Sequence, residues 1–265
     1  MLEPQWPLPP GILLPHAESV GLSAVREEQA KRRHVVVGLV GAHAYGFASP
    51  DSDLDLKAIH VESTGVLLGL KTPAVTFDRL EVIDGVEIDY TSNELGPALV
   101  AILKGNGNFL ERVLGPWNVL ETPLLQELRD LAARSVSRQI VRHYRGFAQG
   151  QLREFEKAQT AKKALYVLRT ALTGAVALRT GRIDPDVNHH LADFGFADAN
   201  ELLEIKRTGE RAPLPTPVPD RWRSRLNDAL QVLEDAASAS PLPEEAPTWA
   251  EADAWLRQTR LRILE

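Results

Sequence analysis

Two aspartates separated by one residue, Asp53 and Asp55, are the residues of this 265-residue chain whose types and spacing most clearly indicate chemistry. They begin a segment, 53–61, whose pattern predicts a β-strand. Side chains alternate between the two faces of a strand, so both carboxylates point the same way, with Cα atoms about 6–7 Å apart. Two like charges on one face need a neutralising partner, which a divalent cation such as Mg²⁺ supplies directly.

A third carboxylate is predicted to join them from a hairpin. The dipeptide Asp84-Gly85 indicates a two-residue turn between strands 77–83 and 86–91. Asp89 lies on the face of the second strand opposite its apolar neighbours, and it reaches the pair if this strand lies beside segment 53–61. Three carboxylates can hold two metal ions, one activating an attacking oxygen and one holding a departing phosphate group.

A glycine-bounded segment precedes these acids. The apolar run 35–40 predicts a strand buried on both faces, and it leads into Gly41-Ala42-His43-Ala44-Tyr45-Gly46. A short helix starting there would present free backbone N–H groups as an anion cradle. An anion cradle followed by a carboxylate cluster suits a nucleoside triphosphate with its Mg²⁺.

Other interpretations exist for the acids. An isolated Asp-x-Asp pair often lies in a solvated loop. Asp51, Asp53, Asp55 and Glu62 match positions 1, 3, 5 and 12 of a calcium-binding loop, but Leu56 stands where that loop needs glycine. The calcium interpretation is therefore disfavoured.

The composition limits the class of protein. Hydrophobic residues make up 44% of the chain and charged residues 25%, which is typical of globular proteins. The net charge of −6 argues against a surface that binds nucleic acid everywhere, and the absence of cysteine excludes disulfides and thiolate chemistry. No apolar run is long enough for a membrane span, and the proline-rich start lacks a basic leader, so a cytoplasmic location is expected.

The order of the predicted elements indicates an α+β protein. A small mixed-sheet domain, 1–92, with an N-terminal extension, 1–16, precedes a helical domain, 93–265, that contains a proline-rich connector, 211–219. Helices are predicted at 17–33, 93–104, 108–114, 122–133, 137–158, 161–180, 220–237 and 248–263.

A series of arginines opens the helical half. Arg134, Arg138, Arg142 and Arg145 form a stripe if their segment is one continuous helix. The stripe is either a solvated basic face that pairs with acidic residues of the chain or a wall that binds the phosphates of an RNA end.

Several stretches resemble a known family: GAHAYGFASPDSDLDLKAIHV, EIDYTSNEL, LKGNGNFLERVLGP, HYRGFAQGQ and KKALYVLRTALTG. They resemble the DNA polymerase β-type nucleotidyltransferases, and most closely the predicted nucleotidyltransferases associated with RNA ligase and RNA repair. The resemblance implies a polymerase β-like palm domain. It also implies that Asp53, Asp55 and Asp89 are the catalytic metal ligands and that Gly41-Ala42 is the phosphate-binding turn.

The resemblance implies further nucleotide-binding residues. A lysine at the start of a helix, Lys162 or Lys163, would reach the β- and γ-phosphates, and Arg169 shares a helical face with Lys162. Serine usually follows the glycine of the turn, whereas this chain has Ala42, which removes one hydrogen bond worth about 1 kcal/mol. His43 or Ser52 is the candidate replacement donor.

The leading hypothesis is a nucleotidyltransferase that uses Mg²⁺ or Mn²⁺, with two ions expected. It would transfer a nucleoside monophosphate from a nucleoside triphosphate to a hydroxyl of an RNA end, with Arg138, Arg142 and Arg145 as candidate RNA contacts. One alternative is transfer to a protein or small-molecule hydroxyl. Another is a non-catalytic, nucleotide-binding antitoxin-like module that pairs with a protein partner.

Overall fold

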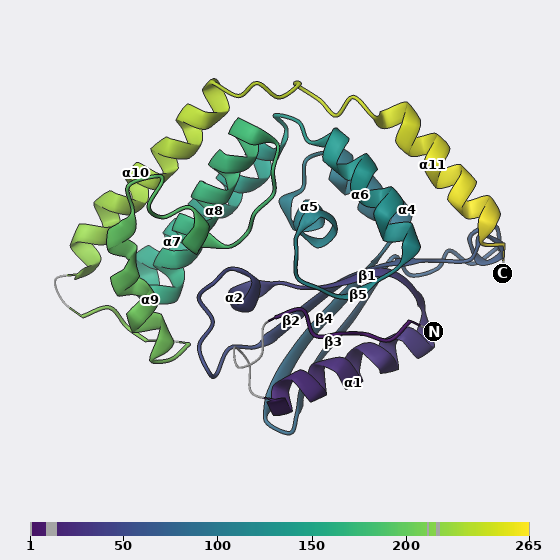
Figure 1. Cartoon of the computed structure of the whole chain (residues 1–265), viewed down its shortest axis with the longest axis horizontal. Helices are drawn as coiled ribbons and strands as arrows, with labels where there is room; N and C mark the ends of the chain where they lie inside the picture. Colours follow the sequence, from purple (N-terminus) through teal and green to yellow (C-terminus); the bar gives the residue numbers. More distant parts are fainter. Residues whose placement is uncertain (1, 9–14, 211, 216–217, 265) are drawn as a thin grey trace. The chain divides into compact units, whose positions relative to one another are not determined.

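The computed structural model describes residues 2–8, 15–210, 212–215 and 218–264 (Figure 1). The chain forms two compact units, each built from separate stretches of sequence. Unit 1 comprises residues 1–40, 53–135 and 246–265, and unit 2 comprises residues 41–52 and 136–245.

Unit 1 contains a five-stranded mixed sheet with the strand order β3-β4-β2-β1-β5. The strands are β1 (Arg33–Leu39), β2 (Leu54–Val61), β3 (Thr76–Ile83), β4 (Val86–Glu94) and β5 (Asn118–Glu121). β2 and β4 are parallel, and the other neighbouring strands are antiparallel. The sheet confirms the mixed architecture expected from the sequence.

The central strands follow from their composition. β1 contains three consecutive valines that are fully buried, as expected for a strand covered on both faces. In β2 the residues Leu54, Leu56 and Ala58 are completely buried and alternate with half-buried polar residues. The buried set packs against Val20 and Ala24 of α1 (Pro15–Lys31) in one hydrophobic core. The polar set of β2 consequently lies on the opposite face of the sheet.

Three helices pack against the strands of unit 1 from the side opposite α1 (Figure 1). They are α4 (Leu95–Leu103), α5 (Gly107–Leu114) and α6 (Pro123–Ser135). α11 (Trp249–Arg262) returns to this unit and packs on α4, where Arg260 pairs with the buried Glu94 at 2.6 Å. A one-turn helix, α3 (Thr64–Leu67), follows β2.

Unit 2 is helical. Its helices are α2 (Gly41–Ala44), α7 (Ile140–Ala158), α8 (Ala161–Thr180), α9 (Asn200–Arg207) and α10 (Val218–Ser238), with 3₁₀ turns at Val187–His189 and Ala197–Ala199. α8 packs against α7, α9 and α10, and 14 of its 20 residues are buried. Thr160 caps α8 by accepting a hydrogen bond from the backbone of Lys163.

The hairpin and the main helices lie where the sequence predicts them. Asp84 and Gly85 both have positive φ, 49° and 83°, as the predicted two-residue turn requires. β5 and α9 were not predicted, since each is short and the sequence around it lacks a clear period.

The two units do not follow the predicted boundary at residue 92. The helices α4, α5 and α6 belong with the sheet, because the face turned away from α1 also needs an apolar cover. Segment 41–52 belongs with the helical unit instead.

Two predicted connecting segments lie partly outside the described residues. In the N-terminal extension, 1–16, Gln5 donates a backbone hydrogen bond to Val119 of β5, and Leu8 is buried in the core of unit 1. In the connector, 211–219, Leu214 is buried and bonds to the backbone of Gln159.

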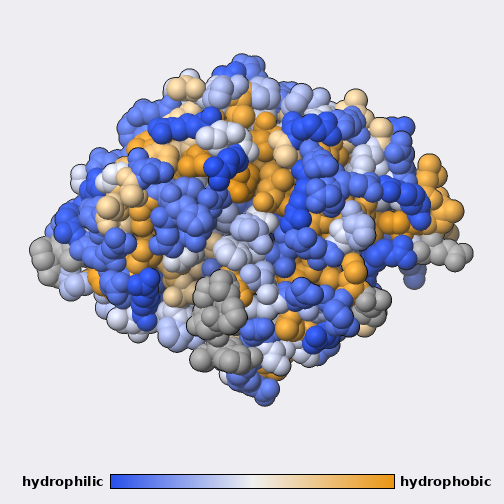
Figure 2. Space-filling view, in the orientation of Figure 1, coloured by the Kyte–Doolittle hydropathy of each residue, from blue (hydrophilic) through white to orange (hydrophobic). Residues whose placement is uncertain are grey.

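Hydrophilic side chains, blue in Figure 2, cover much of the face shown, with apolar residues in smaller groups among them. Within the described ranges, none of the helices has both the length and the apolar composition needed to span a bilayer.

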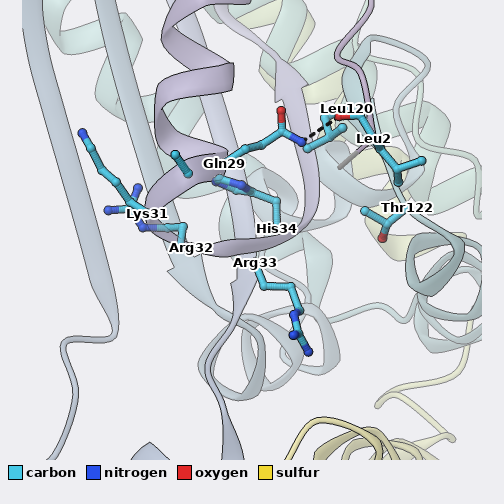
Figure 3. A pocket seen from close by; sticks show the side chains of 9 residues that line it. Leu2, Gln29, Lys31, Arg32, Arg33, His34, Leu120 and Thr122 are labelled. Atoms are coloured by element: carbon cyan, nitrogen blue, oxygen red, sulfur yellow. Dashed lines mark hydrogen bonds between the residues drawn. The ribbon is translucent and has the colours of Figure 1, made fainter. Parts of the chain in front are cut away.

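A cavity of about 410 Å³ lies in unit 1 where α1 ends and β1 begins (Figure 3). His34 lines it together with Gln29, whose side chain donates to the backbone of Leu2 at 3.0 Å. His34 pairs with His60 across the sheet, whereas the far end of β1 pairs beside Asp55. The cavity is therefore at the other end of β1 from the predicted carboxylate cluster.

Burial makes His34 a source of pH-dependent stability. The ring is 6% exposed, and its Nε2 hydrogen-bonds with the Tyr90 hydroxyl at 2.6 Å. Loss of hydration, together with the charge of nearby Arg32, lowers the pKa of His34 from 6.5 to about 4. Between these values the unfolded chain binds a proton that the folded protein excludes, so stability present above pH 6.5 is lost as the pH falls towards 4.

We predict that lowering the pH from 7.5 to 5.0 destabilises the wild type by about 2 kcal/mol more than it destabilises His34→Gln. Urea unfolding at the two pH values measures this difference. His16→Gln, at an exposed position, is the matched control and should respond to pH as the wild type does. Equal pH responses of wild type and His34→Gln would refute the assignment.

Candidate active site

The three predicted carboxylates all belong to unit 1, and the sheet register brings two of them side by side. β2 and β4 are parallel with Asp55 directly opposite Asp89, and Asp53 immediately precedes β2. Leu54, Ile88 and their buried neighbours face α1, so the half-buried aspartates share the opposite face. The two strands therefore lie side by side, which is the condition that the hairpin interpretation set for Asp89 to reach the pair.

Lys57 is a further charged residue on the carboxylate face. It lies two residues after Asp55 on β2, and its Nζ donates to Asp89 Oδ1 at 2.6 Å and towards Thr91 Oγ1 at 3.3 Å. The Lys57 side chain is 17% exposed and the Asp89 side chain 44% exposed. The chain's own ammonium group thus partly neutralises this face.

The donor types on this face fit Mg²⁺, because carboxylate oxygens are the hard ligands that this ion prefers. In the described part of the chain, however, no three acidic or imidazole side chains are gathered closely enough to form a metal-binding group. Asp89, which is bonded to Lys57, would have to turn towards Asp55 to take part in such a group.

The predicted phosphate-binding turn belongs to unit 2. Gly41 has a φ of +68°, a conformation that glycine adopts without strain, and α2 begins at this residue. Ala42 and His43 are both buried, and His43 Nε2 lies 3.4 Å from the backbone oxygen of Ser52. His43 and Ser52, the two candidate replacement donors, are therefore neighbours, and the replacement of the missing hydroxyl by either stays a prediction.

A tight turn at residues 49–52 continues this loop. The backbone N–H of Ser49 donates to Ser52 Oγ at 3.0 Å, and the backbone N–H of Ser52 donates to the oxygen of Ser49 at 3.0 Å. The two hydroxyls lie 3.1 Å apart. Both hydroxyls are consequently presented on the same side of the turn.

The hydroxyls of this turn belong to a cluster that also contains two lysines and one glutamate. Lys206 Nζ donates to Ser49 Oγ at 2.5 Å and to Glu210 Oε2 at 2.5 Å, and Lys162 Nζ also bonds to Glu210. Ser52 Oγ donates to the same Glu210 oxygen at 2.9 Å. Burial alone would raise the pKa of Glu210, but the hydrogen bonds from Lys162 and Lys206 outweigh it and the pKa is lowered.

The structure distinguishes the two lysines that open α8. The Lys162 side chain bonds to Glu210, which in turn bonds to Ser52, whereas Lys163 contributes its backbone N–H to the cap of the helix. We therefore assign the predicted role of the phosphate-directed lysine to Lys162 as a proposal.

Arg169 is buried against the same loop. Its guanidinium carbon lies 3.6 Å from the centre of the Tyr45 ring, and the side chain is 2% exposed. Tyr166, one turn earlier on α8, contacts the rings of Tyr45 and Phe47 edge-on. Arg169 therefore stacks on the loop that carries the predicted phosphate-binding turn, and any role in nucleotide binding remains a prediction.

The four arginines do not meet the condition for a stripe, which was one continuous helix. α6 ends at Ser135 and α7 begins at Ile140, so Arg134 and Arg138 are not on the helix that carries Arg142 and Arg145. The gap between the two helices coincides with the change of unit at residues 135 and 136.

Most of these arginines pair with acids of the same unit. Arg138 bonds to Glu244 at 3.0 Å, and Arg145 Nε bonds to Glu234 at 2.6 Å. These contacts favour the interpretation that the basic residues balance acidic ones. Arg142 is exposed, and RNA contact by Arg138, Arg142 and Arg145 stays a prediction.

The sequence analysis missed Lys57, Lys206 and Glu210. Lys57 could have been found, because its position two residues after Asp55 puts it on the carboxylate face. Lys206 and Glu210 are spaced i, i+4, which marks a helical ion pair but says nothing about Ser52, more than 150 residues earlier.

Comparison with known proteins identifies the family. Residues 19–258 match the model of the RNA repair pathway DNA polymerase β family, so the chain belongs to this family. An uncharacterized protein of Methanocaldococcus jannaschii is 28% identical over 156 residues, which are 57% of this chain. The matching region spans 63% of that relative, so the chain covers less than two thirds of its length.

Among solved structures, a nucleotidyltransferase-like protein from Exiguobacterium sibiricum is similar at a TM-score of 0.33 and 11% identity, over 91% of this chain and 78% of that one. Similarity at this level adds nothing to the family assignment.

If the carboxylate face binds a divalent cation, Lys57 opposes that binding, because its ammonium group is bonded to one of the ligands. We predict that Lys57→Gln binds Mn²⁺ about fivefold more tightly than the wild type, which corresponds to about 1 kcal/mol for a partly exposed charge pair. Electron paramagnetic resonance of free Mn²⁺ measures the affinity. Lys57→Arg keeps the charge and should bind as the wild type does; unchanged or weaker binding by Lys57→Gln would contradict the prediction.

Proposed function

We propose that the protein is a divalent-metal-dependent nucleotidyltransferase that transfers a nucleoside monophosphate from a nucleoside triphosphate to a hydroxyl of an RNA end. Membership of the RNA repair pathway DNA polymerase β family supports the reaction class and suggests RNA as the acceptor. The single observation that carries the proposal is the in-register placement of Asp55 beside Asp89 on a partly exposed face.

Asp53, Asp55 and Asp89 would hold Mg²⁺. When bound, the ions would neutralise the triphosphate and lower the pKa of the attacking hydroxyl. The hydroxyl oxygen forms a bond to the α-phosphorus while the bond from that phosphorus to the pyrophosphate oxygen breaks. Asp89, whose side chain is 44% exposed, would accept the proton of the attacking hydroxyl.

The residues of the 41–52 loop and of α8 would bind the triphosphate. Gly41 and Ala42 offer backbone N–H groups at the start of α2, and Ser52 and Lys162 offer a hydroxyl and an ammonium group. Ser52 and Asp53 are consecutive in the chain, so the phosphate-directed and metal-directed residues are joined by one peptide bond.

We predict that Asp55→Asn and Asp89→Asn each lower the rate of nucleotide transfer at least about 100-fold, because each removes a metal ligand and, for Asp89, the proton acceptor. The assay follows labelled nucleotide into an RNA pool and pyrophosphate into solution, with each of the four nucleoside triphosphates and Mg²⁺. Asp84→Asn is the matched control, because Asp84 lies in an exposed turn whose positive φ asparagine also adopts.

The position of the label separates the alternatives. Label on protein or on an added aminoglycoside, in place of RNA, would replace the RNA acceptor with a protein or small-molecule hydroxyl. Nucleotide binding without any transfer, equal in wild type and both variants, would overturn the enzymatic proposal and favour a nucleotide-binding module that acts through a protein partner.

A further inference from the structure

The carboxylate of Glu210 receives more donors than an ordinary ion pair supplies. Lys206 and Ser52 donate to its Oε2 at 2.5 and 2.9 Å, Ser49 lies 3.4 Å from the same oxygen, and Lys162 bonds to Oε1. The donors come from three separate segments of unit 2: the 49–52 turn, the start of α8 and the end of α9. Three segments thus converge on one anionic group.

The donors themselves are fixed and largely removed from water. The Lys206 side chain is completely buried, Ser49 is 5% exposed, and the Lys162 side chain is 30% exposed. A buried ammonium group is costly unless an anion accompanies it. The cluster therefore needs an anion at this place, whether or not that anion is Glu210.

A phosphoryl group satisfies this cluster better than a carboxylate does. Two ammonium groups and two hydroxyls face a single negative charge in Glu210, whereas a terminal phosphate brings three oxygens and up to two negative charges. Both anions accept the same hydrogen bonds at the same donors, so they exclude one another.

The position of Glu210 in the chain allows its side chain to move out of the cluster. It lies in the turn after α9, which ends at Arg207, and its backbone N–H bonds to the exposed carboxylate of Asp51 at 3.0 Å. Withdrawal of its side chain breaks none of the backbone hydrogen bonds of α9. Lys206, by contrast, is part of the helix and stays in place.

We infer that Lys162, Lys206, Ser49 and Ser52 form a binding site for a terminal phosphoryl group, and that Glu210 is an internal anion that occupies the site until the phosphate of a nucleoside triphosphate displaces it. The inference rests on the proposed function, since it gives that nucleotide its terminal-phosphate contacts. It adds Lys206 and Ser49 to the binding residues and assigns Glu210 the role of a competitor. The affinity for nucleotide is then reduced by the fraction of molecules in which Glu210 fills the site.

The test is the affinity for inorganic tripolyphosphate and for ATP, measured by calorimetry on the full chain in metal-free buffer. Glu210→Gln keeps the shape of the side chain but removes the charge, and it should bind both ligands about tenfold more tightly than the wild type. Lys162→Gln should bind them about tenfold more weakly. Glu204→Gln, which changes an exposed ion pair with Arg207 on α9, is the matched control and should bind as the wild type does.

The outcomes separate this inference from the proposed function. If the wild type binds the ligands and Glu210→Gln binds them equally or more weakly, the competitor role of Glu210 is overturned. The nucleotidyltransferase proposal then still stands. Tighter binding by Glu210→Gln supports the inference even if no transfer to RNA is found. Absence of binding by both proteins overturns the phosphoryl site and with it the triphosphate contacts proposed above.

A second variant keeps the inference testable if Glu210→Gln does not fold. If thermal unfolding shows that Glu210→Gln is not folded, Glu210→Asp keeps the charge but shortens the side chain by one methylene. It should bind tripolyphosphate several-fold more tightly than the wild type, and unchanged binding would overturn the inference.

Discussion

The pairing of Asp89 with Lys57 and of Glu210 with two lysines, each within one unit, is the constraint on which the rest of the candidate site depends. In unit 1, Lys57 is bonded to Asp89 on the carboxylate face. In unit 2, Glu210 is bonded to Lys162 and Lys206. Groups of like charge that lie partly out of water cannot remain together without such partners. The folded chain therefore carries one internal cation where a metal ion would bind and one internal anion where a phosphate would bind.

This self-neutralisation explains how a site for a highly charged ligand can exist in a stable protein. Removing one partner of a buried ion pair leaves the other uncompensated, which costs several kcal/mol in typical cases. The completely buried Lys206 is the most sensitive position in this respect. In the proposed function, a divalent cation would replace Lys57 as the partner of Asp89 in unit 1, and a phosphate group would replace Glu210 as the partner of Lys162 and Lys206 in unit 2.

Local patterns in the sequence were sufficient to predict the elements that carry the acids. Alternation along segment 53–61 put Asp53 and Asp55 on one face, and the apolar neighbours of Asp89 indicated which face of β4 carries it. Patterns of this kind depend on a few neighbouring residues, so the structure they predict does not require knowledge of distant contacts. The identities of the metal, the acceptor and the nucleotide stay predictions, because they depend on side-chain positions that the pattern of strands and turns does not determine.

What the sequence could not predict depends on contacts between distant segments. The boundary at residue 92 failed because α4, α5 and α6 are needed to cover the second face of the sheet. Glu210 was not found because its partners are separated from it by 48 residues at Lys162 and by 158 at Ser52.

The path of the chain through the two units limits how independent they can be. Segment 41–52 leaves unit 1 after β1 and returns to it before β2, and these two strands are hydrogen-bonded neighbours. The backbone N–H of Val40 donates to the oxygen of Asp55 at 2.9 Å, which closes the base of this excursion. Residues 246–265 cross back to unit 1 a second time, where Thr248 bonds to Ser135 at 2.6 Å. Neither unit is a continuous stretch of chain, so a cut at any single position separates elements that one unit needs. The loop that carries the proposed phosphate-directed residues is therefore attached at its two ends to β1 and β2.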